Sequence, residues 1–280
     1  MIVFKKVTDL VNFVLTNKKN HQNIGFVPTM GALHAGHLSL IEEAGKATDL
    51  VVCSIFVNPT QFNDPKDFEK YPITIDQDIY LLEKAGCSVL FLPSVTEMYP
   101  NGINGVKKYE LGFLETILDG KYRPGHFQGV CQIMDRLLQI VQPDKLFMGQ
   151  KDYQQCMVLK ELINNQFPSV QFTMCSTQRE IDGLAMSSRN VRLKEEDRKI
   201  AVKIFEILQF LKENIKEGDL TGIKIDMVKK LTDLHFKVDY VEIVLANTLK
   251  PIDNWDGKEP LVALIAAFLG EVRLIDNFII

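Results

Sequence analysis

The chain has 280 residues, of which 46% are hydrophobic and 24% are charged, a balance that can bury the cores of two domains. Its formal net charge of −4 gives no general attraction to nucleic acid or to an anionic membrane, so local groups must hold any anionic ligand. These values argue against a nucleic-acid-binding protein and against a protein of the membrane surface.

The cysteines and the N-terminal segment bear on the compartment. The five cysteines are odd in number, widely spaced and without a C-x-x-C pair, a pattern typical of reduced thiols and not of a disulfide framework or a zinc site. The first ten residues lack the apolar core of a secretory signal, and no apolar stretch reaches the roughly 18 residues that span a membrane. We therefore expect a cytoplasmic protein without membrane contact and without a metal held by the protein.

The first 176 residues alternate strand-like and helix-like segments. Short apolar runs, typical of strands buried on both faces, occur at 24–28, 50–57, 88–92, 145–148 and 170–175. Segments with helical spacing lie between them at 37–47, 76–86, 128–141 and 152–166. This order predicts an α/β domain over residues 1–176, with a Rossmann-like, doubly wound parallel sheet that binds ligands beyond the carboxyl ends of its strands.

The pattern changes at about residue 177. One long helical pattern runs from Glu195 to about Lys216, and a second spans roughly 222–235. Three strand-like runs follow, with the sequences VDYVEIVLA, PLVALIAAFLG and VRLIDNFII. We predict a smaller C-terminal α+β domain over residues 177–280.

The segment PTMGALHAGH, residues 28–37, follows the first predicted strand and opens a helix. Gly31 and Gly36 permit a tight turn and a close approach of the backbone to a ligand, and a helix N-terminus attracts phosphate. His34 and His37, three residues apart, point the same way on a first helical turn and can donate hydrogen bonds to a phosphate. The alternatives are a plain corner with two surface histidines, or a metal site, for which no third ligand is evident nearby.

Two further segments carry uncharged or turn-forming residues. Asn58, Gln61 and Tyr71 follow the predicted strand at 50–57 and suit a hydroxyl or a carboxylate. Arg123 and His126 lie among glycines and a proline, directly before a predicted helix. Either segment can instead be an ordinary polar loop.

The segment FMGQKDYQQ, residues 147–155, again follows a strand and opens a helix. Lys151 is a mobile point charge suited to phosphate, Asp152 can accept from a ribose hydroxyl, and Gln155 lies one turn further along. In the alternative interpretation, Asp152 only favours the start of the helix and Lys151 is solvated.

A short polar cluster follows the predicted domain boundary. Ser187, Ser188 and Arg189 form a loop able to close over a triphosphate. The serines can instead cap the next helix, although a cap nearer Glu195 is the more natural start and leaves the loop available.

Together these five segments resemble the family of pantothenate synthetases, the pantoate–β-alanine ligases. FVPTMGALHAGHLSLI, FVNPTQF, YRPGHF, GQKDYQQ and GLAMSSRN agree with the family in order and spacing, over nearly the whole chain. The turn H-A-G-H also resembles the H-x-G-H signature of the nucleotidylyltransferase superfamily. The resemblance implies a nucleotide- and pantoate-binding N-terminal domain, a C-terminal lid domain and a homodimer.

The resemblance also implies a reaction in two steps. The carboxylate of (R)-pantoate attacks the α-phosphorus of ATP, which carries Mg²⁺, and gives pantoyl-adenylate and pyrophosphate. The amine of β-alanine then attacks the acyl carbon, giving pantothenate and AMP. Because no Ser, Cys or Lys forms a convincing nucleophile–base pair, no covalent intermediate with the enzyme is needed.

The residue roles implied by the resemblance follow its motifs. The implied ATP-binding residues are Met30, Gly31, Ala32, Leu33, His34, Ala35, Gly36, His37, Gly149, Gln150, Lys151, Asp152, Gln178, Met186, Ser187, Ser188 and Arg189. His37, His34 and Lys151 would act at the phosphates as catalytic groups. Gln61 and Gln155 would bind pantoate, and Gln61 would also lie beside β-alanine.

One position departs from the family pattern. Ile73 stands where many members have arginine in Y-P-R-T, which affects the detail of that loop and not the reaction.

Two other functions are alternatives to the ligase. A nucleotidylyltransferase acting on another small substrate would use the same H-x-G-H turn, but no cluster for a phosphorylated substrate is evident. A nucleotide-binding module without catalysis, or an RNA-binding fragment, fits poorly with the acidic balance and the intact motifs.

Overall fold

Residues 1–103 and 107–280 are described by the structure, a computed structural model of the chain. The chain divides into two units, the first comprising Met1–Gly149 and Gln155–Ser176, the second Gln150–Gln154 and Thr177–Ile280. The second unit thus includes five residues that the predicted division after residue 176 assigns to the first. Within the described residues, no helix combines the length and the apolar character needed to span a membrane.

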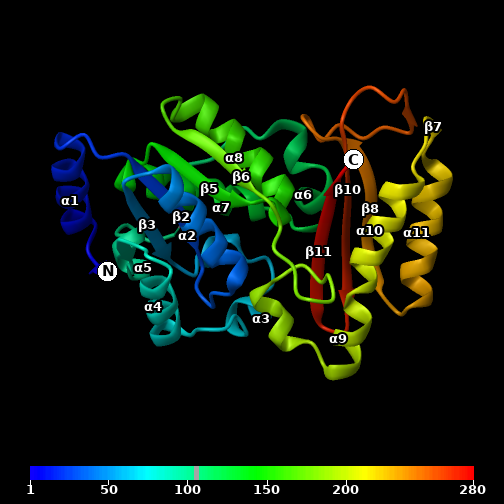
Figure 1. Cartoon of the computed structure of the whole chain (residues 1–280), viewed down its shortest axis with the longest axis horizontal. Coiled ribbons are helices and arrows are strands. Elements are labelled where there is room, and N and C mark those ends of the chain that lie inside the picture. The colour runs from blue at the N-terminus through cyan, green and yellow to red at the C-terminus, as the bar shows by residue number, and fades with distance from the viewer. Residues whose placement is uncertain (104–106) are drawn as a thin grey trace. The chain divides into compact units, whose positions relative to one another are not determined.

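A six-stranded parallel sheet forms the inner layer of the first unit (Figure 1). Its strands, in sheet order, are β1 (Ile2–Phe4), β4 (Val89–Phe91), β3 (Leu50–Ile55), β2 (Ile24–Thr29), β5 (Lys145–Gly149) and β6 (Gln171–Cys175). This sheet confirms the predicted α/β fold. The predicted first strand, at 24–28, is the second strand of the chain, because the three-residue β1 and helix α1 (Val7–Lys19) precede it.

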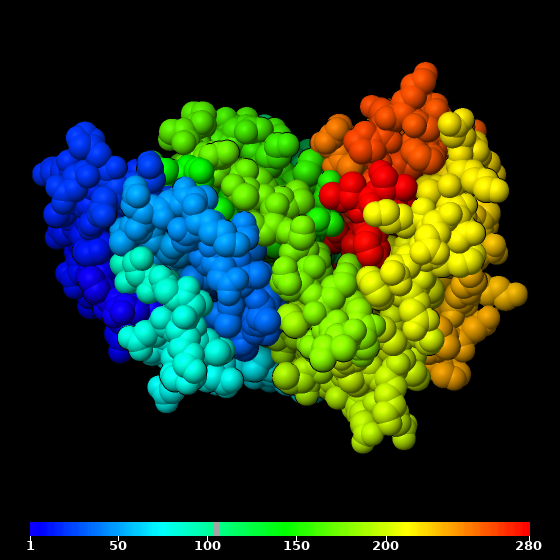
Figure 2. Space-filling view, viewed as in Figure 1, coloured from blue at the N-terminus to red at the C-terminus, as the bar shows by residue number. Residues whose placement is uncertain are grey.

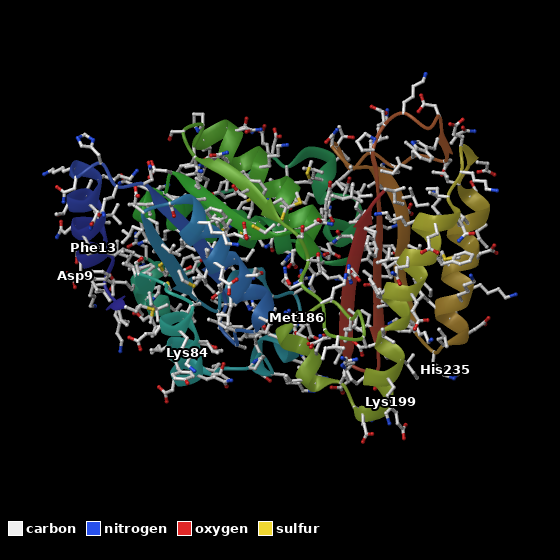
Figure 3. All side chains as sticks on the ribbon, in the orientation of Figure 1. Asp9, Phe13, Lys84, Met186, Lys199 and His235 are labelled. Atoms are coloured by element: carbon white, nitrogen blue, oxygen red, sulfur yellow. The ribbon has the colours of Figure 1, made fainter. Side chains whose placement is uncertain are left out.

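Consecutive residues of the strands face opposite sides of the sheet, and each side has its own hydrophobic core. Phe26 belongs to one core and Val27 to the other, and Leu146 and Phe147 are divided in the same way. The first core is covered by α1, which carries Asp9 and Phe13 (Figure 3), and by α7 (His126–Val141) and α8 (Tyr153–Gln166). The second core is covered by α2 (Ala35–Ala47) and α4 (Ile75–Lys84).

The order of the strands creates a switch point between β2 and β5. From β2 the chain proceeds to β3 on one side, and it later returns to β5 on the other side of β2. At such a point the following connections leave in opposite directions, so the carboxyl ends of the two strands border a crevice that suits a ligand. The segments after Thr29 and Gly149 both start at this edge of the sheet.

Short elements complete the first unit. They are η1 (Pro59–Gln61), α3 (Pro65–Glu69), α5 (Val95–Met98), η2 (Gly112–Glu115) and α6 (Leu118–Tyr122).

The second unit has a three-stranded antiparallel sheet, as predicted for the C-terminal region, in the order β11 (Val272–Ile279), β10 (Leu261–Leu269) and β8 (Lys237–Leu245). Helices α10 (Lys203–Asn214) and α11 (Thr221–Asp233) pack on this sheet and form the yellow to orange surface of the unit in Figure 2. The other elements of this unit are η3 (Gln150–Asp152), η4 (Ser188–Arg192), α9 (Glu195–Ala201), β7 (Gly218–Asp219) and β9 (Asn254–Trp255).

The long helix predicted from Glu195 is wrong in one respect, because it is divided at Val202. Val202 keeps helical dihedral angles (φ −60°, ψ −21°), and its carbonyl accepts from the N–H groups of both Phe205 (2.9 Å) and Glu206 (3.2 Å). Its own N–H is directed to the carbonyl of Ile200, two residues back, where an α-helix uses the carbonyl four residues back, and this irregularity separates α9 from α10. No glycine or proline marks the break, so the sequence pattern runs through it.

Two leucines of α1 give a matched test of the first core. Leu10 is fully buried and Leu15 is 43% exposed. We expect Leu10→Ala to lower the free energy of unfolding by about 2–5 kcal/mol, because it removes buried methyl groups and leaves a cavity. Leu15→Ala should change it by less than about 1 kcal/mol. Urea denaturation followed by circular dichroism measures both, and equal losses would contradict the assignment of α1 to the core.

Candidate functional site

The turn after β2 has an unusual backbone path. Gly31 (φ +81°) and Ala32 (φ +49°) both adopt left-handed conformations, which is unusual for alanine. The hydroxyl of Thr29 donates to the carbonyl of Ser54 at 2.8 Å and accepts from the N–H of Gly31 at 3.2 Å. The turn is therefore anchored to the end of β3 before helix α2 begins.

The carboxylate of Asp78 holds the other side of this turn. It is fully buried on α4, and it accepts from the N–H groups of Ala32 (2.9 Å) and Leu33 (2.8 Å) and from the hydroxyl of Thr74 (3.0 Å). Bonds to an ionised acceptor are stronger than neutral ones, so this carboxylate can fix the left-handed conformation of Ala32. Sequence reasoning missed Asp78; the available signal was an acidic residue four positions before buried Leu82, on the apolar face of the predicted helix.

His34 and His37 lie together at the N-terminus of α2. The Nδ1 atom of His34 accepts from the N–H of Gly36 at 3.2 Å, and the Nδ1 atom of His37 accepts from the N–H of His34 at 3.3 Å. The ring centroids are 4.1 Å apart. Since each Nδ1 acts as an acceptor, the proton of each neutral ring is on Nε2, where it can be donated to a phosphate oxygen.

Asn58 connects the second predicted segment to the first unit's core. Its side chain is 1% exposed; it donates to Gln61 Oε1 (3.2 Å) and to the carbonyl of Gly129 (3.1 Å), and it accepts from the hydroxyl of Tyr99 (2.8 Å). Burial raises the pKa of Tyr99 and so keeps this hydroxyl protonated as a donor. Asn58 therefore positions Gln61, and its amide is occupied within the protein.

Gln61 lies beside the turn after β2. Its Nε2 donates to the sulfur of Met30 at 2.9 Å, so the segment after β3 meets the segment after β2. The structure thus brings together two of the segments that sequence analysis assigned to ATP and to pantoate. Both belong to the first unit.

Arg123 and His126 hold the backbone of Gln61. Arg123 donates to Nε2 of His126 at 3.1 Å, which leaves Nδ1 of that ring to donate to the carbonyl of Gln61 at 2.8 Å. Asn63 also donates to the carbonyl of Pro124. The third predicted segment therefore holds the second in place. The two segments are also closely packed, because a Cβ added at Gly129 would lie 2.3 Å from the carbonyl oxygen of Thr60.

The segment after β5 is divided between the two units. Gly149 ends β5, and Gln155 lies in the first turn of α8; both belong to the first unit. Gln150, Lys151 and Asp152 form η3 in the second unit.

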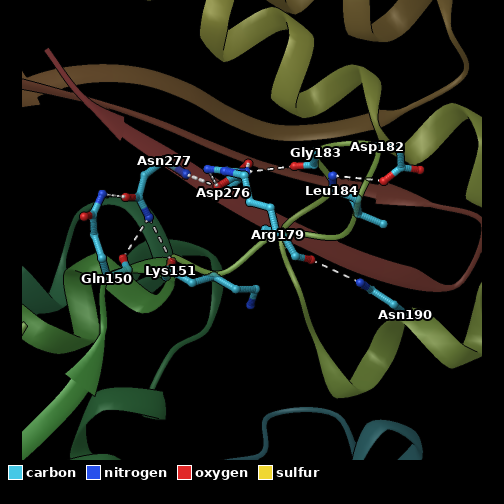
Figure 4. A network of polar contacts seen from close by, with 10 residues as sticks. Gln150, Lys151, Arg179, Asp182, Gly183, Leu184, Asn190, Asp276 and Asn277 are labelled. Carbon is cyan, nitrogen blue, oxygen red and sulfur yellow. Dashed lines mark hydrogen bonds and ion pairs between the residues drawn. The ribbon is translucent and has the colours of Figure 1, made fainter. Parts of the chain in front are cut away.

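Asn277, which sequence reasoning missed, holds η3 in the second unit (Figure 4). Its Nδ2 donates to the carbonyls of Gln150 (3.0 Å) and Lys151 (2.9 Å), and its Oδ1 accepts from Nε2 of Gln150 (3.0 Å). The signal in the sequence was an Asp-Asn pair inside a run of otherwise apolar strand residues.

The loop before η4 has a defined shape in the second unit. The N–H of Met186, labelled in Figure 3, donates to the carbonyl of Gln178 at 3.0 Å, so these two predicted residues lie opposite each other. The hydroxyl of Ser187 accepts from the N–H of Arg189 at 3.3 Å and caps η4. Ser187 therefore caps a short turn whose first residue is Ser188, while α9 begins separately at Glu195 with no side-chain cap.

Lys151 and Ser187 line the same small cavity of the second unit. Its volume is about 10 Å³, close to that of a single water, and Asn190, Arg273 and Asp276 are among its other lining residues. Two of the segments predicted to contact ATP thus meet within this unit. Among residues 1–103 and 107–280, no three His, Cys, Asp or Glu side chains are grouped as metal ligands.

Comparison with known proteins identifies relatives along the whole chain. A family model described as pantoate-beta-alanine ligase matches residues 2–279. A pantothenate synthetase of Porphyromonas gingivalis is 44% identical over 278 residues, which are 99% of this chain and 98% of the relative. One from Fervidobacterium nodosum is 47% identical over 262 residues, 92% of each chain.

Solved structures agree with these relatives. A crystal structure of pantothenate synthetase from Thermus thermophilus has a TM-score of 0.89 at 37% identity and covers 99% of each chain. A pantoate-beta-alanine ligase from Francisella tularensis, complexed with beta-gamma ATP and beta-alanine, has a TM-score of 0.85 at 39% identity, covering 99% of this chain and 97% of that chain.

Asp78→Asn tests the support of the turn after β2. The amide nitrogen of asparagine would face a backbone N–H, so one buried hydrogen bond is lost, and we expect the free energy of unfolding to fall by about 1–3 kcal/mol. Hydrogen exchange at Ala32 and Leu33 should accelerate. The control is Asp76→Asn on the exposed side of the same helix, which should leave both quantities nearly unchanged. Unchanged exchange at Ala32 and Leu33 in the Asp78 variant would exclude the carboxylate as the support.

Proposed function

Since the chain belongs to the family of pantoate–β-alanine ligases, we propose that it condenses (R)-pantoate with β-alanine to pantothenate, converting ATP to AMP and pyrophosphate. The observation that carries the proposal is the position of H-A-G-H at the switch point of the sheet, in a chain that matches the family from end to end. The other segments would add binding groups for an acid and an amine to this nucleotide site.

In the proposed first step, the pantoate carboxylate attacks the α-phosphorus of ATP. A carboxylate oxygen–phosphorus bond forms, the bond to pyrophosphate breaks, and pantoyl-adenylate results. Negative charge grows on the phosphate oxygens, where Nε2–H donors of His34 and His37 and the partial positive charge of the α2 N-terminus stabilise it. Lys151 would add a point charge at the phosphates.

In the proposed second step, the uncharged amine of β-alanine attacks the acyl carbon of the adenylate. The carbon–nitrogen bond forms, the bond to the phosphate oxygen of AMP breaks, and the nitrogen loses a proton. Most of the required catalysis is positioning of two bound reactants and stabilisation of charge, for which the site supplies hydrogen-bond donors and no nucleophile.

The acid and the amine would be held in the first unit. Gln61 and Gln155 are the proposed pantoate-binding residues, and Gln61 would also contact β-alanine. Support comes from the way Gln61 is fixed: Asn58 holds its side chain and His126 holds its backbone. A side chain fixed in this way loses little freedom when a ligand binds.

The nucleotide would also contact the second unit. The proposed contacts are Gln150–Asp152, with Asp152 at the ribose, the backbone of Gln178, and Met186–Arg189. In the first unit, the proposed contacts are the residues of the turn from Met30 to His37 and Gly149. The shared cavity of Lys151 and Ser187 supports the grouping in the second unit.

Mg²⁺ would arrive as part of the ATP substrate. The described residues of the turn and of η3 supply imidazole, amide and a single carboxylate, Asp152, which suits an ion held mostly by phosphates and water. We also propose a homodimer in the cytoplasm; support comes from the resemblance and, for the compartment, from the reduced, widely spaced cysteines.

The fate of the phosphates tests the proposed function. AMP release from ATP that requires both pantoate and β-alanine supports the ligase. A stable nucleotidyl product would instead favour the second candidate, a nucleotidylyltransferase of the same superfamily, which the H-x-G-H turn alone also fits.

His37→Ala should slow adenylate formation by about 10²–10³-fold, because one donor to the developing charge is removed. Pantoate-dependent exchange of labelled pyrophosphate into ATP measures this step without β-alanine. The matched control is His21→Ala, an exposed histidine with a left-handed backbone that lies outside the five motifs, which should keep the wild-type rate. A wild-type exchange rate in the His37 variant would remove this residue from the mechanism.

Gln61→Ala should raise the KM for pantoate by about tenfold while changing the KM for ATP by less than about twofold, because one or two hydrogen bonds to the acid are lost. Steady-state kinetics with each substrate varied in turn give both values. Gln77→Ala, on the exposed side of α4, serves as the control. A defect confined to ATP would contradict the assignment.

A further inference from the structure

Strand β11 carries a buried polar pair in an otherwise apolar setting. Asp276 is 4% exposed and Asn277 is 2% exposed. Burial of a charge and an amide is costly unless both are hydrogen-bonded, so their partners are informative. Successive side chains of a strand point to opposite faces, and these neighbours therefore reach different segments of the second unit.

Asn277 uses its whole amide group on η3. Two donated bonds take the carbonyls of Gln150 and Lys151, and the accepted bond fixes the side chain of Gln150. These carbonyls come at the start of a helix, where the backbone path decides the direction of the Lys151 side chain. One side chain thus sets the conformation of the turn that carries Lys151 (Figure 4).

Asp276 holds the loop before η4 through Arg179. The guanidinium of Arg179 donates to both carboxylate oxygens of Asp276, at 2.6 and 3.0 Å. It also donates to the carbonyl of Gly183 at 3.1 Å. Burial raises the pKa of Asp276, and the hydrogen bonds from Arg179 oppose that shift.

The same guanidinium lies against two neighbouring aromatic rings. Its carbon lies 4.5 Å from the ring centroid of Phe205 and 5.0 Å from that of Phe278. Gly183 turns with φ +97° against Phe205, where a Cβ would lie 2.2 Å from the ring. The loop that leads from Arg179 to Met186 is therefore tightly fixed to β11 at its base.

We propose that Asp276 and Asn277, adjacent residues of one strand, are positioning residues for ATP. Asn277 fixes the backbone of η3, and Asp276 fixes the loop before η4, so that the two segments keep their positions relative to each other. Lys151, Ser187 and Asp276 line the same cavity, so a change in either anchor displaces groups that face the same place. The inference rests on the proposed function for the identity of the nucleotide, and it adds the residues that preorganise its site.

Three near-isosteric variants test the proposal. Asn277→Asp turns a carboxyl oxygen toward the carbonyls of Gln150 and Lys151, Asp276→Asn removes the charge facing Arg179, and Arg179→Lys keeps the charge but loses the paired bonds. The control is Lys224→Gln in the same unit. Lys224, with a side chain 15% exposed, pairs with Asp253 at 2.9 Å and with Glu242 at 3.6 Å, and these three residues lie outside the lining of the cavity.

We expect Asn277→Asp and Asp276→Asn each to weaken ATP binding by about tenfold or more, since one or two hydrogen bonds to the nucleotide lose their alignment. Arg179→Lys should have a smaller effect in the same direction. The KM values for pantoate and β-alanine should stay within about twofold of wild type. Lys224→Gln should lower the melting temperature without changing ATP affinity.

Titration calorimetry with ATP measures binding directly, and steady-state kinetics give the KM of each substrate. Wild-type ATP affinity in the β11 variants, with a lower melting temperature as in Lys224→Gln, would overturn the proposal, as would an equal rise of all three KM values. Calorimetry does not depend on condensation. A wild-type chain that binds ATP but releases no AMP with pantoate and β-alanine would therefore count against the proposed function alone.

Discussion

Parallel pairing of β2 with β3 on one side and β5 on the other is the constraint on which the candidate site depends. Parallel strands must be covered on both faces, and this requirement places α2 and α4 on one side and α1, α7 and α8 on the other. The reversal of direction at β2 then leaves two connections diverging from one edge. The chain uses that edge twice, for the turn of His34 and His37 and for the segment after Gly149. The order of the strands thus determines where the candidate site lies in the first unit, whichever side chains then occupy it.

Much of the fold was predictable because its elements are long or strongly apolar. The runs at 24–28 and 145–148 are buried on both faces, and the helical pattern of 128–141 matches α7 to within two residues. Prediction was poorest where the signal is short or absent. The three-residue β1 has two exposed residues, Ile2 and Val3, and the break at Val202 is made by a hydrogen bond and not by a breaking residue. Such features depend on tertiary contacts that no local pattern records.

The candidate site was predictable where glycines and histidines gather, and much less so where buried polar groups support them. Asp78 and Asn277 each bond a backbone segment that is distant in sequence, and Asp276 pairs with the side chain of Arg179, 97 residues away. Each of these residues looks ordinary in its own stretch of sequence. Arg123 and His126 show that residue type leaves the partner open. Their types suit ligand contacts, and the structure also gives them bonds to each other and to the backbone of Gln61. Residue type indicates capacity for a bond, and only the fold decides the partner.

The excursion of Gln150–Gln154 into the second unit has a consequence for how the chain is built. The polypeptide passes between the units at 149/150, at 154/155 and at 176/177, so a single cut near residue 177 does not separate them. A C-terminal fragment beginning there would lack Gln150 and Lys151 and would leave the Asn277 amide without its three bonds. It would also lack Tyr153, whose hydroxyl donates to the carbonyl of Ala246 at 3.0 Å. Each unit is therefore built from two separate stretches of sequence, and no single contiguous segment of the gene encodes one unit completely without including part of the other or dividing it.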